Sequence, residues 1–193
     1  VTTPRPHPDA APLSVPAEAA TVLAFWKEAG PDKWFAKNDA FDDLFRSGFL
    51  ALHEKAARGE LRSWLDTPGG ALALLLLLDQ FPRNCFRNTP RMYATDPLAR
   101  AMAAEAIARG HDRLIPQEMA HFMYLPYGHS EALADQARCV ALSERLGEPN
   151  LGHARHHHDL VKRFGRFPHR NPILGRAMTA EEQAYLDEGG YKG

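Results

Sequence analysis

Two segments far apart in the chain share a motif, Phe-Pro-Arg-Asn at residues 81–84 and Phe-Pro-His-Arg-Asn at residues 167–171. Both lie in basic stretches that contain no acidic residue, three arginines within residues 80–95 and five Lys or Arg within residues 160–180. The planar guanidinium of arginine binds carboxylate and phosphate groups alike. In a chain of net charge −1, these stretches require either acids from elsewhere in the fold or an external anion.

Asp79 is unusual because it directly follows the apolar run 71–78. Pro82 disfavours the α conformation at the residue before it, so we expect the helix to end there and the first motif to form a loop. A negative charge is costly beside apolar side chains and at a helix C-terminus. Asp79 therefore requires a cationic partner. Arg83 and Arg87 are nearest in sequence, but the expected break in the helix argues against a simple one-turn pair.

A third segment places His129 directly before an expected helix start and Glu131 in the first turn of that helix. Free backbone N–H groups at such a start can hold an anion. Our first hypothesis is that this helix start and the two Phe-Pro loops converge on one anion-binding pocket, in which Asp79 orients an arginine. The candidate ligand-binding residues are Asp79, Gln80, Arg83, Asn84, Arg166, His169, Arg170 and Asn171.

The alternative interpretation is that the same arginines close internal ion pairs with Asp79 and Glu131 and fasten helix ends. We favour it, because buried charges usually occur in pairs. The surplus of basic residues keeps the anion pocket as the second interpretation.

Three functions remain open at this point. The first is a helical binding module for a small anionic ligand or an acidic peptide terminus. The second is an enzyme in which His129 or His169 acts as general acid or base beside Glu131, and these three are the candidate catalytic residues. The third is a structural protein that interacts with a protein partner and binds no ligand. An enzyme requires His129 and Glu131 within hydrogen-bond reach, whereas a module requires an exposed basic concavity.

A run of histidines raises the question of a metal site. His153 and His157 lie one helical turn apart, which is a known ligand geometry. The nearest acid, Asp159, points to another helix face, and no cysteine is nearby. We therefore predict no metal site and no cofactor. The two cysteines, Cys85 and Cys139, match no metal spacing and are expected to be reduced and partly buried.

The overall charge and the apolar runs exclude some partners. A net charge of −1 argues against binding of nucleic acid or of a membrane surface by bulk electrostatics. The longest apolar run, residues 71–78, is far shorter than the ~20 residues of a membrane helix. Residues 1–16 contain five prolines and no apolar core of a signal peptide, so we expect a disordered segment and a cytoplasmic protein.

The elements that must position these residues are helices. The chain has 23 Leu and 30 Ala against 5 Val and 3 Ile, which favours an all-α fold. Cap residues, glycines and prolines predict eight or nine helices in antiparallel pairs that form a single domain over residues 17–193. The run 71–78 is apolar on every face and is predicted to be the central helix. The other predicted ranges are 17–29, 39–59, 96–110, 116–125, 130–147, 149–164 and a short helix after Thr179.

These motifs resemble those of the domain-of-unknown-function family numbered nine hundred and twenty-four. The resemblance covers about Val22 to Leu186 and is carried by Leu-Leu-Leu-Asp-Gln-Phe-Pro-Arg-Asn, by Pro126 with His-Ser-Glu, and by the second Phe-Pro motif with its flanks. It implies a tetratricopeptide-like helical array and no particular activity. The chain departs from the family pattern at Gly128, where an acid is common, and at Ala132. A mechanism that needs several carboxylates at that point is thereby weakened.

Overall fold

The structure is a computed structural model in which residues 14–193 are described, so most of the segment expected to be disordered lies outside the described residues. Within residues 14–193 the chain is helical and contains no strand, which confirms the all-α prediction. Because α4, η2 and α5 form one continuous helix, the part of the chain that the structure describes contains nine separate α-helical units. The arrangement of their pairs as a tetratricopeptide-like array stays a prediction.

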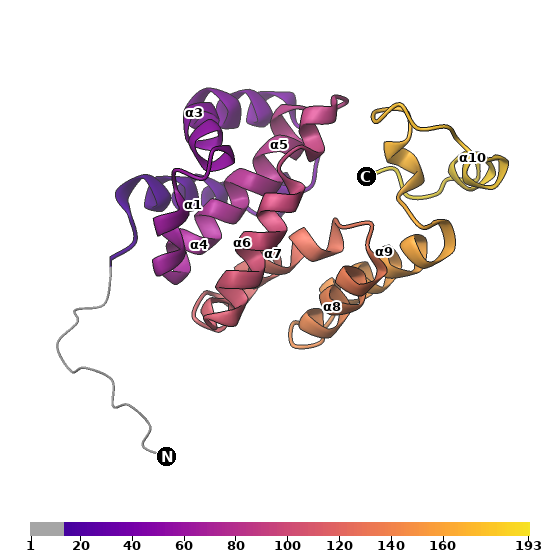
Figure 1. The fold of residues 1–193 in the computed structure, drawn as a ribbon. Coiled ribbons are helices and arrows are strands. Elements are labelled where there is room, and N and C mark those ends of the chain that lie inside the picture. Colours follow the sequence, from indigo (N-terminus) through magenta and orange to yellow (C-terminus); the bar gives the residue numbers. More distant parts are fainter. Residues whose placement is uncertain (1–13) are drawn as a thin grey trace, which may run out of the picture.

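The helices follow one another with short connections (Figure 1), and their bounds are as follows. The α-helices are α1 (Ala17–Ala29), α2 (Pro31–Trp34), α3 (Asp39–Ala57), α4 (Pro68–Leu75), α5 (Phe81–Cys85), α6 (Asp96–Ala108), α7 (Gln117–Gly128), α8 (Leu133–Ser143), α9 (Asn150–Phe164) and α10 (Ala180–Asp187). One π-helical turn, η2 (Leu76–Gln80), and the 3-10 turns η1 (Arg62–Asp66), η3 (Pro90–Tyr93), η4 (His111–Arg113) and η5 (Pro168–Arg170) complete the chain.

Local capping signals start several of these helices where the sequence predicts them. Asn38 accepts a hydrogen bond from the backbone N–H of Phe41, and Thr67 accepts one from Gly70. Thr179 and Glu182 form a reciprocal capping box at the start of α10.

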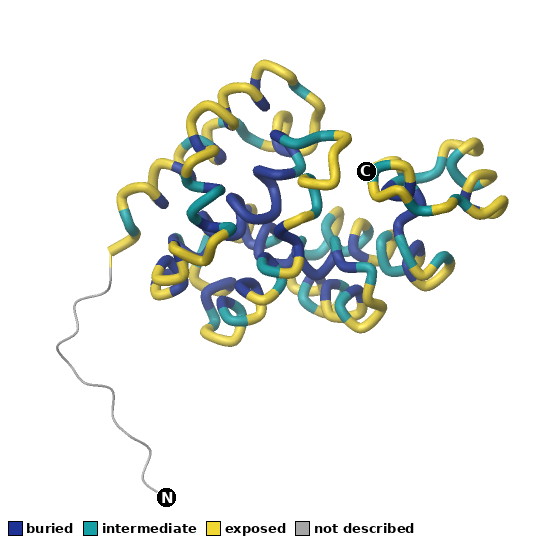
Figure 2. Tube along the Cα trace, turned by 45° about the horizontal axis from the view of Figure 1, so that its top comes forward, coloured by how far each residue is buried: buried dark blue, intermediate teal, exposed yellow. Residues whose placement is uncertain are grey.

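The continuous helix α4–η2–α5 is the centre of the fold. Its leucines are buried, with no exposed surface from Leu75 to Leu78. The helices α1, α3, α6 and α7 pack around it, and the buried central segment is visible in Figure 2. A helix with apolar residues on all faces has this position because each face needs a partner. The predicted central helix is confirmed.

The prediction that the first Phe-Pro motif forms a loop is wrong. Phe81 has helical torsions (φ −52°, ψ −49°), and the chain passes through Pro82 without a break. The π turn makes this possible, because the Phe81 N–H bonds to the carbonyl of Leu76 instead of that of Leu77. Pro82 has no N–H to offer Leu78. Tertiary partners replace both bonds: the His53 ring lies 2.9 Å from the Leu77 oxygen, and the Thr95 hydroxyl donates to the Leu78 oxygen.

Two further helix boundaries differ from the predictions. Pro126 lies inside α7, which continues to Gly128. The next helix begins at Leu133, so Glu131 lies in the connection before it. Side chains hold this connection in place: the Ser130 hydroxyl donates to Asp135 and accepts from the N–H of Ala132.

The residues after α9 form a separate hydrophobic cluster. We call residues 165–193 the C-terminal segment, and it lies beside α9 in Figure 1. Its Phe167 is fully buried and packs with residues of α9 and of the chain end, Leu160, Val161, Phe164, Tyr185 and Tyr191. The contacts that join this segment to α6 and to the connection after α7 are polar, and they build the site described next.

Candidate functional site

Asp79, at the end of the central helix, is the most deeply buried carboxylate of the site, with 1% of its side chain exposed. It accepts hydrogen bonds from Nδ1 of His129 at 2.8 Å and from the Gln80 amide at 2.7 Å. Burial alone would raise the pKa of Asp79, but the charge of Arg83 and the contact with His129 hold it at about 2. Asp79 is therefore ionised at neutral pH and can only accept hydrogen bonds.

Arg83 is the main partner of two carboxylates. Its Nη1 lies 3.2 Å from the carboxylate of Asp79 and 2.8 Å from that of Asp96, and its Nη2 lies 2.9 Å from the second oxygen of Asp96. The one-turn pair with Asp79 forms because the helix is not broken at Pro82. Asp96 lies in the first turn of α6, 13 positions after Arg83. Arg83 therefore links the end of the central helix to the start of α6.

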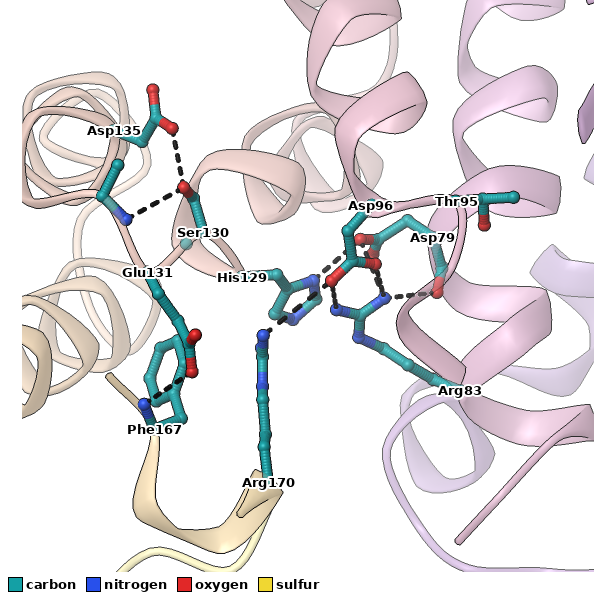
Figure 3. Close-up of polar contacts among 12 residues, drawn as sticks. Asp79, Arg83, Thr95, Asp96, His129, Ser130, Glu131, Asp135, Phe167 and Arg170 are labelled. Atoms are coloured by element: carbon teal, nitrogen blue, oxygen red, sulfur yellow. Dashed lines mark hydrogen bonds and ion pairs between the residues drawn. The ribbon is translucent and has the colours of Figure 1, made fainter. Parts of the chain in front are cut away.

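Arg170 reaches the same network from the C-terminal segment (Figure 3), and only 6% of this residue is exposed. Its guanidinium lies over two aromatic rings, 4.6 Å from the centroid of Tyr93 and 4.5 Å from that of Phe167. Its nearest carboxylate oxygen belongs to Asp96, 3.9 Å away, which is too long for a hydrogen bond. Within residues 14–193 its guanidinium donates no hydrogen bond, and its Nε is buried without a partner.

Two neighbours of this guanidinium also have buried polar atoms without a partner in the described part of the chain. They are the hydroxyl of Tyr93 and Nδ1 of His169. Burial, followed by the charge of Arg170, lowers the pKa of His169 to about 3, so this ring is neutral at physiological pH. Buried polar groups usually have a hydrogen-bond partner, so three such atoms on neighbouring residues call for an explanation.

Glu131 connects the C-terminal segment to the helical body. Its carboxylate accepts two hydrogen bonds from Arg176, at 2.7 and 3.0 Å, and one from the backbone N–H of Phe167 at 2.8 Å. No hydrogen bond joins Glu131 to His129 within residues 14–193; the partner of His129 is Asp79. The predicted acid–base pair of His129 and Glu131 is therefore not formed in this structure.

The predicted ligand-binding residues do not all lie in one place. Asp79, Gln80, Arg83 and Arg170 lie in the network around His129, and His169 lies near Arg170. Other motif residues pair elsewhere: Arg166 forms an ion pair with Glu182 at 2.6 Å, Asn84 donates to Asp42, and Asn171 accepts from Arg176.

Three members of the site have no distinctive pattern in the sequence. Asp96 is expected only at a helix start, Arg176 is one of five basic residues in its stretch, and nothing in the sequence distinguishes Tyr93. One feature of the sequence indicates such members indirectly. The two basic stretches contain no acidic residue, so their arginines require carboxylates from other helices.

Replacing Glu131 with glutamine is expected to loosen the C-terminal segment. The substitution preserves the shape but leaves Arg176 without its charged partner, at an expected cost of about 1–3 kcal/mol. Hydrogen exchange of the amides in residues 167–187 measures the effect. The matched control is Glu181→Gln, which breaks the exposed pair with Arg163 and is expected to cost about 0–1 kcal/mol. Equal exchange in both variants would contradict the role of Glu131.

The histidine run and the hydrophobic helices give no further site. Within residues 14–193 no group of three His, Cys, Asp or Glu side chains is arranged to hold a metal ion. Burial lowers the pKa of His157 to about 3, and its Nδ1 lies 3.2 Å from the carbonyl of Gly128. In the same part of the chain no helix is both long and apolar enough to cross a membrane.

Comparisons with known proteins agree with this fold and assign no activity. Residues 22–190 match the model of a family described as bacterial protein of unknown function, DUF924. The structure is similar to the solved structure of the protein of unknown function ATU0120 from Agrobacterium tumefaciens, with a TM-score of 0.88 and 56% sequence identity. That alignment covers 90% of this chain and 98% of the other. No curated protein matches the sequence.

Proposed function

Because the chain belongs to DUF924, a family of bacterial proteins of unknown function, we propose its function from the geometry of the buried network alone: it binds a small oxyanion between Arg170 and His129. One observation carries this proposal. The guanidinium of Arg170, a residue with 6% of its surface exposed, lies against two aromatic rings and makes no hydrogen bond within residues 14–193, and its Nε is buried without a partner.

A buried guanidinium without acceptors is unfavourable. Transfer of a charged group out of water costs several kcal/mol, which hydrogen bonds and an opposite charge must repay. The carboxylate nearest to Arg170 is that of Asp96, but Arg83 already binds both of its oxygens. At 3.9 Å the contact between Arg170 and Asp96 is an ion pair without a hydrogen bond, so the donors of Arg170 remain available to another acceptor.

Charge alone does not require an external anion. In the site as a whole, the charges of Arg83, Arg170 and Arg176 are balanced by the three carboxylates of Asp79, Asp96 and Glu131. The proposal therefore rests on unsatisfied donors, since a bound oxyanion supplies acceptors that the internal carboxylates do not provide. Arg170 is also suited to oxyanion recognition, because a planar guanidinium forms bidentate hydrogen bonds with carboxylate and phosphate groups.

Replacing Arg170 with alanine is expected to weaken anion binding at least about 100-fold, because Arg170 supplies the free donors. Binding is measured by titration calorimetry of the protein with inorganic phosphate, and independently by the rise in melting temperature that a ligand of the folded state causes. Because the native protein makes no hydrogen bond through this guanidinium, we expect a loss of unfolding free energy of only about 1 kcal/mol.

The matched control is Arg166→Ala, which removes an arginine from the same segment of the chain. Arg166 is paired with Glu182 and lies outside the network, so phosphate affinity is expected to stay as in the unchanged protein. Two results would contradict the proposal. One is unchanged phosphate affinity in the Arg170 variant, and the other is a loss of several kcal/mol of stability with no phosphate binding by the unchanged protein.

A further inference from the structure

We propose, building on the proposed function, that this site selects an oxyanion with an O–H donor of its own, as hydrogen phosphate has, and rejects sulfate. The geometry that points to this selection is one hydrogen-bond acceptor, Nε2 of His129, that faces the free donors of Arg170. A protonated oxyanion can accept hydrogen bonds from Arg170 and donate its O–H to Nε2 of His129. An unprotonated oxyanion has no proton to donate, so its oxygen is repelled by the lone pair of Nε2.

The position of the proton on His129 follows from its partner. Asp79 is ionised and can only accept, and Nδ1 of His129 lies 2.8 Å from its carboxylate. The proton of the imidazole therefore sits on Nδ1. Nε2 is left with a lone pair, for which residues 14–193 provide no hydrogen-bond donor.

The imidazole is held in this neutral form by its surroundings. Burial lowers the pKa of His129, and the charge of Arg83 lowers it further, while Asp79 and Asp96 act in the opposite direction. The charged and titratable groups that face the ring come from five elements. They are Asp79 of η2, Arg83 of α5, Asp96 of α6, His157 of α9, and His169 and Arg170 of η5.

The donors that face Nε2 of His129 are the N–H groups of Arg170. The Tyr93 hydroxyl beside them also has no partner in the described residues. Figure 3 shows the end of the Arg170 side chain directed toward His129, Asp96 and Arg83. Hydrogen phosphate can accept from the guanidinium and donate its own O–H to Nε2. Sulfate carries no proton at neutral pH, so one of its oxygens would meet a lone pair and leave Nε2 unsatisfied. An acceptor left without a donor is the basis on which sites built for an O–H group reject analogues that lack it.

The same argument separates free phosphate from a phosphate monoester. The second pKa of a phosphate monoester is about 6. At pH 7.5 most monoester molecules are dianions without a proton, whereas the inorganic dianion retains one. We expect methyl phosphate to bind weakly at pH 7.5 and several-fold more tightly at pH 6.0, where much of it is protonated.

The test compares inorganic phosphate, sulfate and methyl phosphate by titration calorimetry of the full chain at equal ionic strength. At pH 7.5 we expect phosphate to bind at least about 10-fold more tightly than sulfate. In His129→Asn the amide can still donate to Asp79 in place of Nδ1, but the Nε2 acceptor is lost. This variant is expected to bind both ions with similar affinity, and Arg170→Ala is expected to lose both.

The outcomes separate this inference from the proposed function. Equal affinity for sulfate and phosphate in the unchanged protein, lost in Arg170→Ala, would overturn the selection for an O–H donor and leave anion binding in place. A preference for phosphate that persists in His129→Asn would also overturn it. Absence of binding for all three anions would overturn the proposed function together with the inference.

Discussion

Replacing Arg83 with alanine is expected to lower the free energy of unfolding by about 3–5 kcal/mol, because it leaves two carboxylates in the protein interior without their partner. Asp79 has 1% of its side chain exposed and Asp96 has 11%. Both oxygens of Asp96 lose their hydrogen bonds, and the charge that most favours ionisation of Asp79 disappears. Urea denaturation followed by circular dichroism measures the loss.

The control for Arg83 is Arg91→Ala, eight positions further along the chain. Arg91 pairs with Glu54 at 2.5 Å, but 56% of the Arg91 side chain and 42% of the Glu54 side chain are exposed, so the expected loss is only about 0–1 kcal/mol. A loss as small in Arg83→Ala would show that water or a rearranged side chain replaces Arg83, and the network would then not hold the fold together.

Acidification from pH 7 to pH 5 is expected to lower the free energy of unfolding by roughly 5–6 kcal/mol. Burial lowers the pKa of His157 and of His169 to about 3 and that of His121 to about 4. In the unfolded chain these rings titrate near 6.5. Between these values the unfolded state binds more protons than the folded state, so stability is full above pH 6.5 and falls as the pH decreases toward 3. Each such histidine contributes a slope of up to about 1.4 kcal/mol per pH unit.

Denaturation midpoints at several pH values between 7 and 5 measure this slope. The pH range separates histidines from carboxylates, since Asp79 already has a pKa of about 2 in the folded state and titrates only in stronger acid. His157→Gln and His169→Gln each remove one titrating ring and are expected to flatten the pH dependence. An unchanged slope in both variants would show that these rings are protonated in the folded protein.

Most helices could be predicted because their signals are local. Asn38, Thr67 and Thr179 cap the helices that follow them, and a side chain that bonds to the backbone three residues later is visible in any short stretch of sequence. The leucine run 71–78 identified the central helix for a similar reason, because a segment without a polar face has to be covered on all sides.

The helix through Pro82 could not be predicted, because it depends on residues distant in the chain. Pro82 weakens the helix locally, and the usual preference of the preceding residue predicts an end. In the folded protein His53 and Thr95 supply the hydrogen bonds that the carbonyls of Leu77 and Leu78 lose. These partners lie 24 and 17 positions away, and no local pattern indicates that they are present.

For the site, the amino-acid sequence by itself determined which residue types would meet at the end of the central helix: arginines in excess, one carboxylate after an apolar run, and histidines. Only the tertiary structure decided which arginines are satisfied. Arg83 and Arg166 each form hydrogen-bonded ion pairs with a carboxylate. The carboxylate nearest to Arg170 is that of Asp96, and both of its oxygens already accept hydrogen bonds from Arg83. The reason is physical: an ion pair depends on distances of 3–4 Å between side chains of different helices, and those distances follow from packing of the whole core.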